Sequence, residues 1–188
     1  MTIHNLSDGN SVLNQYIAEI RDKNIQKNHM RFRRNLERIG EIFAYEISRT
    51  LNYKNVEITT PLGISECSVP ADGIVLATIL RAGLPLHNGL LNFFDDAQNA
   101  FIAAYRKYGK DNKFDIKLEY VTSPSIDGKV LILADTMLAT GASVVLAYHK
   151  LMEDGTPLHT HIVCPIASTY GVEYLSKNLS HKTVTLWT

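Results

Sequence analysis

Three segments of this chain are apolar almost throughout, and they constrain its fold more than any other feature. They are DGIVLATIL at 72–80, KVLILA at 129–134 and THIVCPIAS at 160–168. The first two are each followed by a segment with helical periodicity, LPLHNGLLNFF at 84–94 and GASVVLAYHKLMEDG at 141–155. A strand that is apolar on both sides must be covered on both sides, which helices do in a parallel sheet. We therefore expect an α/β fold with a mostly parallel sheet and helices on both faces.

The remaining segments fit the same architecture. Residues 30–51 predict a helix, because Phe32, Leu36, Ile39, Phe43 and Ile47 recur at steps of three and four residues. An extended segment, NVEITTPLG, follows it, and the polar stretch 107–129 contains the alternating DIKLEYV, which is typical of an exposed strand or β-arm. The other expected elements are a strand at 99–109, a helix at 170–179 and a strand at 182–188.

Charge and cysteine usage exclude some classes of protein. Nineteen basic and nineteen acidic side chains give a net charge of zero, which argues against a nucleic-acid partner. Cys67 and Cys164 lie in apolar contexts without CxxC spacing, so we expect reduced core thiols in a cytoplasmic protein. The polar amino terminus does not resemble a signal peptide, and no apolar run of about 18 residues predicts a membrane span.

Polar residues follow three of the expected strands. Arg81 comes after the first, Arg106 lies in YRK at the end of the second, and Asp135 comes after the third. Because ligands bind outside the carboxyl ends of parallel strands, we expect these three side chains to face one cleft. The alternative for each arginine is a surface salt bridge.

The loop after the third strand has the composition of an anion site. TGAS at 140–143 leads into a helix, whose first backbone N–H groups lack internal partners and carry positive potential. Small residues let a phosphate approach those groups, and Thr140 and Ser143 add hydroxyls. Neither GxxxxGK[ST] nor GxGxxG is present. The alternative is an ordinary Ser/Thr N-cap without a ligand.

Asp135 narrows the choice of ligand. A carboxylate beside a phosphate site is explained by a ligand with hydroxyls next to its phosphate, since a carboxylate accepts hydrogen bonds from a diol. Arg81 and Arg106 suggest a second anionic group in the same cleft. A ribose with a phosphate at one end and a larger anion at the other is 5-phosphoribosyl 1-pyrophosphate.

These residues carry a resemblance to a known family. Residues 130–143 resemble the phosphoribosyl pyrophosphate motif of the type I phosphoribosyltransferases, and DTMLATGAS is similar to the form D-P-M-L-A-T-G-G-S of the uracil phosphoribosyltransferases. ATILRAGLPLHNGLL, VEITTPLG and AAYRKY resemble further segments of that family, from about residue 18 onward. The resemblance implies a single three-layer domain, with an N-terminal helix and hood at about 18–70, a core at about 71–188 and a β-arm.

The resemblance also implies an activity. The family transfers the phosphoribosyl group to N1 of uracil and releases UMP and pyrophosphate, with Mg²⁺ bound mainly through substrate oxygens. It implies catalytic roles for Arg81 and Asp135, a non-proline cis peptide in the RAG segment, an arm at about 107–122 that closes, assembly as a homodimer or higher oligomer, and a possible GTP effector. The implied phosphoribosyl pyrophosphate ligands are Arg81, Arg106, Asp135, Thr136, Met137, Leu138, Ala139, Thr140, Gly141, Ala142 and Ser143.

The chain departs from the family pattern at three places. Thr136 stands where the family usually has Pro, and Ala142 where it usually has a second Gly, so residue 142 must avoid positive φ. The family's base-binding segment, Tyr-Ile-Val-Pro-Gly-Leu-Gly-Asp-Ala-Gly-Asp, lies beyond Thr188, so no residue here is assigned to uracil and we expect a truncated copy of a longer chain. Transfer to another base, and a nucleotide-sensing RNA-binding regulator, remain alternatives. His159 and His161 would face one side of a strand but lack a third metal ligand nearby in the sequence.

Overall fold

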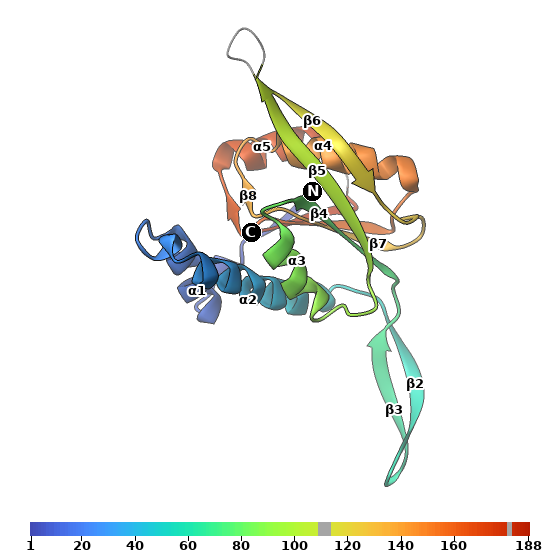
Figure 1. Cartoon of the computed structure of the whole chain (residues 1–188). Coiled ribbons are helices and arrows are strands. Elements are labelled where there is room, and N and C mark those ends of the chain that lie inside the picture. Colours follow the sequence, from blue (N-terminus) through green and yellow to red (C-terminus); the bar gives the residue numbers. More distant parts are fainter. Residues whose placement is uncertain (109–113, 180–181) are drawn as a thin grey trace.

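The computed structural model describes residues 1–108, 114–179 and 182–188. Its central sheet has the strand order β1-β11-β9-β7-β4-β5-β6 (Figure 1), and every neighbouring pair is parallel except β5 and β6. The mostly parallel sheet is therefore confirmed. Its strands are β1 (Thr2–His4), β4 (Ile74–Leu80), β5 (Gln98–Tyr108), β6 (Phe114–Thr122), β7 (Val130–Ala134), β9 (His159–Val163) and β11 (Val184–Trp187).

Helices cover both faces of this sheet. One face carries α1 (Val12–Arg21), α2 (His29–Ser48) and α3 (Leu84–Leu91), and the other carries α4 (Ala142–Leu151) and α5 (Thr169–Asn178) (Figure 1). The two cores divide the residues of β7 between them: Leu131 and Leu133 pack toward α4 and α5, whereas Val130 and Ile132 pack toward the other layer. All four are buried, which is why the strand is apolar throughout.

The apolar composition of the segment 160–168 predicted one strand, and this prediction is wrong. It forms β9 and then the two-residue strand β10 (Ile166–Ala167), which pairs with β8 (Met137–Leu138) in a separate small sheet. Cys164 and Pro165 lie between β9 and β10, and Pro165 lacks the N–H that a ladder would need. The break brings β10 beside the loop that follows β7.

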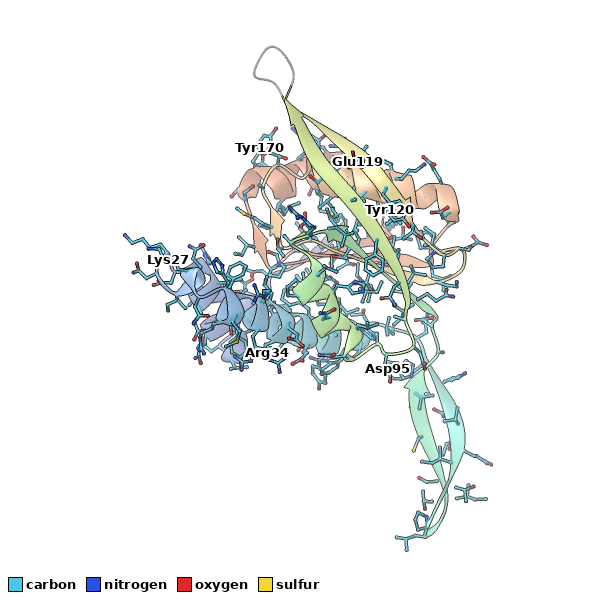
Figure 2. All side chains as sticks on the ribbon, in the orientation of Figure 1. Lys27, Arg34, Asp95, Glu119, Tyr120 and Tyr170 are labelled. Carbon is cyan, nitrogen blue, oxygen red and sulfur yellow. The ribbon has the colours of Figure 1, made fainter. Side chains whose placement is uncertain are left out.

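The expected extended segment is one strand of a long hairpin. Strands β2 (Tyr53–Thr60) and β3 (Gly63–Pro70) pair antiparallel and project from the amino end of β4 (Figure 1). Side chains stand out on both sides of the hairpin (Figure 2), and Leu62 at its tip is fully exposed. Cys67 lies on β3, half-buried, so the expectation of a core thiol is wrong there; Cys164 is fully buried as predicted.

The first 21 residues form elements that the sequence pattern did not predict. Strand β1 adds to the sheet edge beside β11, and α1 packs Leu13, Ile17 and Ile20 into the core. At the other edge, β5 and β6 form the expected arm; its tip, residues 109–113, lies outside the described residues. In the described part of the chain, no helix is long and apolar enough to cross a membrane.

Candidate functional site

The expected site lies where β4 and β7 end side by side. Thr78 of β4 is in register with Ala134 of β7, so the segments that follow the two strands leave the same edge of the sheet. Arg81 follows β4 directly, and Asp135 follows β7. The two residues therefore share one edge of the sheet, as expected. The further expectation that their side chains face one cleft stays a prediction, because Arg81 is not among the residues that line the cavity beside Asp135.

The loop after β7 forms a small cradle, defined by residues 135–143. It encloses a cavity of about 200 Å³. Thr136 and Ala142 do not line this cavity: the Thr136 backbone N–H bonds to Asp135, and Ala142 is the first residue of α4. The lining residues are Asp135, Met137, Leu138, Ala139, Thr140, Gly141, Ser143 and Val144.

Gly141 fixes the shape of the cradle. Its φ of +80° lies in the left-handed region, which costs little for glycine alone. A Cβ there would lie 2.9 Å from Leu175, 3.1 Å from Tyr174 and 3.2 Å from the carbonyl oxygen of Gly171. A side chain at this position would therefore push the cradle away from α5.

The beginnings of the helices separate into two groups. Among the described α-helices, α1, α2 and α5 begin with a side chain that accepts a hydrogen bond from the first turn, supplied by Ser11, Asn28 and Ser168. Helices α3 and α4 begin with Gly83 and Gly141 and have no side-chain cap. These two helices follow β4 and β7, so both amino termini lie at the same edge. At α3 the Leu84 N–H donates to the Arg81 carbonyl and Pro85 has no N–H, so the amino terminus of α4 is the better site for an anion. At α4 the N-cap residue is Gly141 rather than Ser or Thr, and the Thr140 hydroxyl accepts only a long hydrogen bond, of 3.5 Å, from the Ala142 N–H.

Asp135 is held rigidly at the start of the cradle. Its backbone N–H donates to the Val163 carbonyl at 3.0 Å, and its Oδ1 accepts from the Thr136 N–H at 2.8 Å. Burial raises the pKa of Asp135 to about 6, and the Thr136 hydrogen bond opposes that shift. Hydroxyl donors from a ligand would replace the lost hydration and stabilise the carboxylate.

Thr78 links the two strand ends, and the sequence analysis missed it. Its buried hydroxyl donates to the Ala134 carbonyl at 3.2 Å, one residue before Asp135. On its other side, a Cβ on Gly83 would lie 2.2 Å from the Thr78 Oγ1. Thr78 therefore occupies the space between the turn carrying Arg81 and the strand carrying Asp135. The available signal was a hydroxyl residue within an otherwise apolar run.

The two arginines are placed differently. Arg81 lies exposed in the turn between β4 and α3, and the Leu80–Arg81 peptide bond is cis, as the family resemblance implied. Arg106 does not end its strand, because β5 continues to Tyr108. It lies three residues beyond Ala103, the partner of Leu80, so its backbone is in the arm rather than at the strand-end edge. The Arg106 side chain lies outside the described part of the structure.

A comparison with known proteins identifies the family. A sequence profile described as uracil phosphoribosyltransferase matches residues 8–188. The chain belongs to the uracil phosphoribosyltransferase family. This family assignment covers nearly the whole chain, including the hairpin and the arm.

Individual relatives support the assignment to the uracil phosphoribosyltransferase family. A protein named uracil phosphoribosyltransferase from Porphyromonas gingivalis is 51% identical over 187 residues, which cover 100% of this chain and 86% of the relative. One from Methanothermobacter thermautotrophicus is 34% identical over 87% of this chain and 75% of its own. Among solved structures, the AQ2163 protein from Aquifex aeolicus has a TM-score of 0.86 at 23% identity, over 99% of this chain and 85% of that one. A purine phosphoribosyltransferase from Pyrococcus horikoshii has a TM-score of 0.54 at 10% identity, over 82% and 83%. These structural matches show the type I phosphoribosyltransferase fold.

The donor set of the site bears on metal binding. In residues 1–108, 114–179 and 182–188, no group of three His, Cys, Asp or Glu side chains could hold a metal ion. Asp135 is the carboxylate that lines the cradle. Mg²⁺ keeps several waters and is commonly held by one or two carboxylates together with substrate phosphates, and the residues present fit that kind of binding.

Proposed function

We propose that this chain transfers the phosphoribosyl group of 5-phosphoribosyl 1-pyrophosphate to N1 of uracil, giving UMP and pyrophosphate. The observation that carries the proposal is the cradle between Asp135 and the uncapped amino terminus of α4, at the same edge of the sheet as Arg81. In this arrangement the 5-phosphate binds the cradle, the ribose hydroxyls donate to Asp135, and the pyrophosphate faces Arg81. Residues 136–143 and Arg106 complete the proposed contacts to the donor.

The chemistry follows from where charge develops. As the bond between C1 and the pyrophosphate oxygen breaks, negative charge grows on the leaving group and positive charge on the ribose. Arg81 stabilises the leaving group, and the Asp135 carboxylate holds the ribose while uracil N1 forms its bond to C1 and gives up its proton to solvent. Thr78 keeps the two supporting loops in register. Mg²⁺, bound through the oxygens of the donor, would supply further stabilisation of the pyrophosphate charge.

The family resemblance also led us to expect a domain organisation, a cellular location, an oligomeric state and an effector, and these form part of the proposal. We propose a single domain with an N-terminal helix and hood at about 18–70 and a core at about 71–188, a cytoplasmic location, a homodimer or higher oligomer, and GTP as a possible effector. The hairpin β2–β3 extends from the amino end of β4, so it does not cover the cradle of its own chain. No described residue is assigned to the base.

The direct test is product formation by the purified full-length protein with phosphoribosyl pyrophosphate and Mg²⁺. Uracil, guanine, hypoxanthine and orotate are compared as acceptors, and we expect UMP from uracil. No turnover with uracil would overturn the proposal, and turnover with a purine alone would reassign the base.

A variant locates the pyrophosphate contact. Arg81→Ala should lower kcat/KM by about ten- to a hundredfold, because it removes a charge-assisted contact to the leaving group. Arg49→Ala is the matched control, since Arg49 is an exposed arginine at the end of α2. Equal kinetics for the two variants would contradict the role of Arg81.

A further inference from the structure

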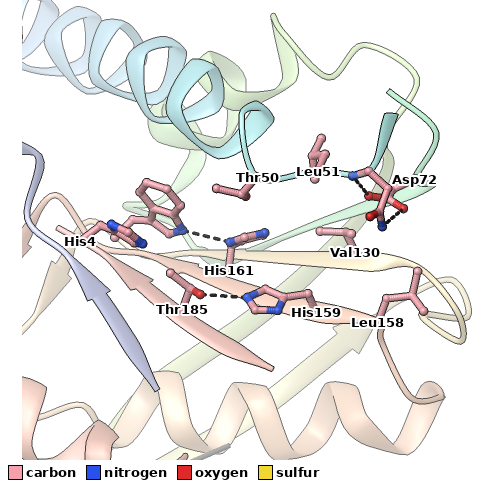
Figure 3. A pocket seen from close by; sticks show the side chains of 11 residues that line it. His4, Thr50, Leu51, Asp72, Val130, Leu158, His159, His161 and Thr185 are labelled. Atoms are coloured by element: carbon pink, nitrogen blue, oxygen red, sulfur yellow. Dashed lines mark hydrogen bonds between the residues drawn. The ribbon is translucent and has the colours of Figure 1, made fainter. Parts of the chain in front are cut away.

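A second cavity, of about 290 Å³, lies on the helical face that carries α2 (Figure 3). It is lined by the first residues of β7 and β9, Val130 and His159, whereas Asp135 follows the last residue of β7. At a rise of about 3.3 Å per residue, Val130 and Asp135 lie about 17 Å apart along the strand. This amino-end cavity, defined by His4, Thr50, Asp72, His159, His161 and Trp187, is separate from the cradle.

The cavity contains a fixed hydrogen-bond donor. The His161 side chain is buried, and its Nδ1 accepts from the indole N–H of Trp187 at 3.0 Å. The ring proton must therefore sit on Nε2. Within the described residues this is the one hydrogen bond of the His161 ring, and the second ring nitrogen faces the cavity (Figure 3). Burial lowers the pKa of His161 to about 3, with smaller contributions from His159 and His4, so the donor is neutral.

Flat rings form the walls around this donor. His4 stacks on Trp187, with ring centroids 4.4 Å apart and planes 20° apart. His159 lies beside His161, at 4.6 Å between centroids, and its Nε2 is 2.9 Å from the Thr185 hydroxyl. Because these rings line the cavity, they give it flat and rigid walls, against which a planar heterocyclic ligand can pack.

The charge of the cavity disfavours an anion. Thr50 and Leu51 follow the last turn of α2, where the helix carries its negative partial charge. Asp72 lines the same space, and its carboxylate accepts from the Asn52 backbone and side chain at 2.8 and 3.0 Å. Among the described lining residues, none is Lys or Arg. A phosphate group would therefore be repelled, whereas an N–H donor can bond to the free lone pairs of Asp72.

We propose that the amino-end cavity binds an uncharged nucleobase or nucleoside. A ring carbonyl accepts from the His161 Nε2–H, and a ring or exocyclic N–H donates to Asp72. This site is independent of the phosphoribosyl pyrophosphate site, and its volume is close to the lower end of the range for small-molecule sites.

The chain supplies its own probe, because Trp187 is its one tryptophan. The full-length protein is titrated with cytosine, adenine, uracil and uridine, and with UTP and GTP, while tryptophan fluorescence is recorded without phosphoribosyl pyrophosphate. We expect saturable binding of at least one base or of uridine. Either triphosphate should bind at least about tenfold more weakly. No saturable change with any base or uridine, or triphosphates that bind as tightly, would overturn the proposal.

Variants place the ligand. Asp72→Asn and His161→Gln should each weaken binding by about tenfold or more, and Asp72→Asn leaves the His161–Trp187 pair in place if the second variant does not fold. Asp135→Asn and Arg81→Ala should leave the titration unchanged. A titration that persists in Asp72→Asn, or that disappears in Asp135→Asn, contradicts this location.

Discussion

The cavities at the two ends of β7 differ in the chemical groups that line them. At the carboxyl end, a small polar cavity is lined by the Asp135 carboxylate, and by a left-handed glycine at the start of a helix that has no side-chain cap. At the amino end, one ring nitrogen of His159 is paired with Thr185 and one of His161 with Trp187, which leaves the His161 Nε2–H facing a cavity with aromatic walls. One rigid strand thus separates a site suited to anions from a site suited to uncharged rings.

The two ends also differ in the sign of their response to pH. Burial raises the pKa of Asp135 to about 6 and lowers that of His161 to about 3. In both cases the fold disfavours the charged form. Charging Asp135 costs stability as pH rises, and charging His161 costs stability as pH falls.

Asp135→Asn should lower kcat/KM more than any other variant proposed here. It removes the carboxylate that distinguishes the carboxyl end of β7 from the amino end. The amide removes the charge and replaces one acceptor oxygen by an NH2 donor, which cannot accept from a ribose hydroxyl, so kcat/KM should fall on the order of a thousandfold. The folded pKa lies above the ordinary value of 3.8, so the Asp135 contribution to the free energy of unfolding becomes less favourable as pH rises from about 4 to about 6. The variant should therefore unfold at higher urea at pH 7, with a gain of up to about 3 kcal/mol.

The control for that variant is Asp95→Asn, which changes an exposed carboxylate. It should alter neither activity nor the urea midpoint. An Asp135→Asn protein that is inactive but also less stable than wild type would contradict a carboxylate destabilised by burial.

The pH dependence of stability tests whether the buried His161 side chain, at the amino end of β7, is held in its neutral form. Its folded pKa of about 3 lies below the ordinary value of 6.5, so the unfolded state binds more protons between these values. The His161 contribution to the free energy of unfolding should therefore become less favourable as pH drops from about 6.5, by up to about 3 kcal/mol at pH 4. Because Asp135 contributes with the opposite sign over part of this range, the contribution is measured as the difference in urea unfolding between wild type and His161→Gln at pH 7, 6, 5 and 4. We expect this difference to shift in favour of the variant as pH falls.

His149→Gln is the matched variant, because His149 is an exposed histidine on α4. It should keep the wild-type dependence of stability on pH. If the free energy of unfolding of His161→Gln changed with pH in parallel with that of wild type, His161 would not be the source of the cost at low pH.

Gly141→Ala and Gly128→Ala place the same substitution near the two ends of β7, and both should cost a similar free energy of backbone strain. Both glycines have positive φ, +80° and +66°, so each substitution costs about 1–2 kcal/mol of strain. Only at Gly141 would the new methyl group meet neighbours within 4 Å. We expect both variants to lose stability, but kcat/KM to fall, by about ten- to thirtyfold, for Gly141→Ala alone. A similar loss of activity in Gly128→Ala would mean that strain, and not the shape of the cradle, controls catalysis.

The sequence predicted the carboxyl end better than the amino end for a physical reason. Strands buried on both faces are apolar throughout, so β4 and β7 and the polar residues after them stand out without knowledge of the fold. The pairing of His161 with Trp187 depends on the register of β9 with β11, which pairs His161 with Thr185. No local pattern encodes that register. The expectation that His159 and His161 share one face was confirmed, but their partner was not predicted.

Two other differences have local causes. Strand β1 has three residues, all exposed, and so has no apolar pattern to detect. Arg106 was expected at a strand end because polar residues follow it, yet β5 continues because β6 pairs with it along the arm. Pairing between strands can extend a strand through polar sequence, which composition does not reveal.

Thr78→Val should give the smallest effect, and it tests whether the two strand ends act as one unit. The substitution keeps the shape of a buried side chain but removes the hydroxyl that bonds to the Ala134 carbonyl, at a cost of about 1 kcal/mol. Because Thr78 is a positioning residue and does not touch the donor, KM for phosphoribosyl pyrophosphate should rise about fivefold with a smaller change in kcat. Thr78→Ser keeps the hydroxyl and should restore KM while losing a methyl group from the core. If the serine variant were as impaired as the valine variant, packing rather than the hydrogen bond would hold Arg81 and Asp135 in register.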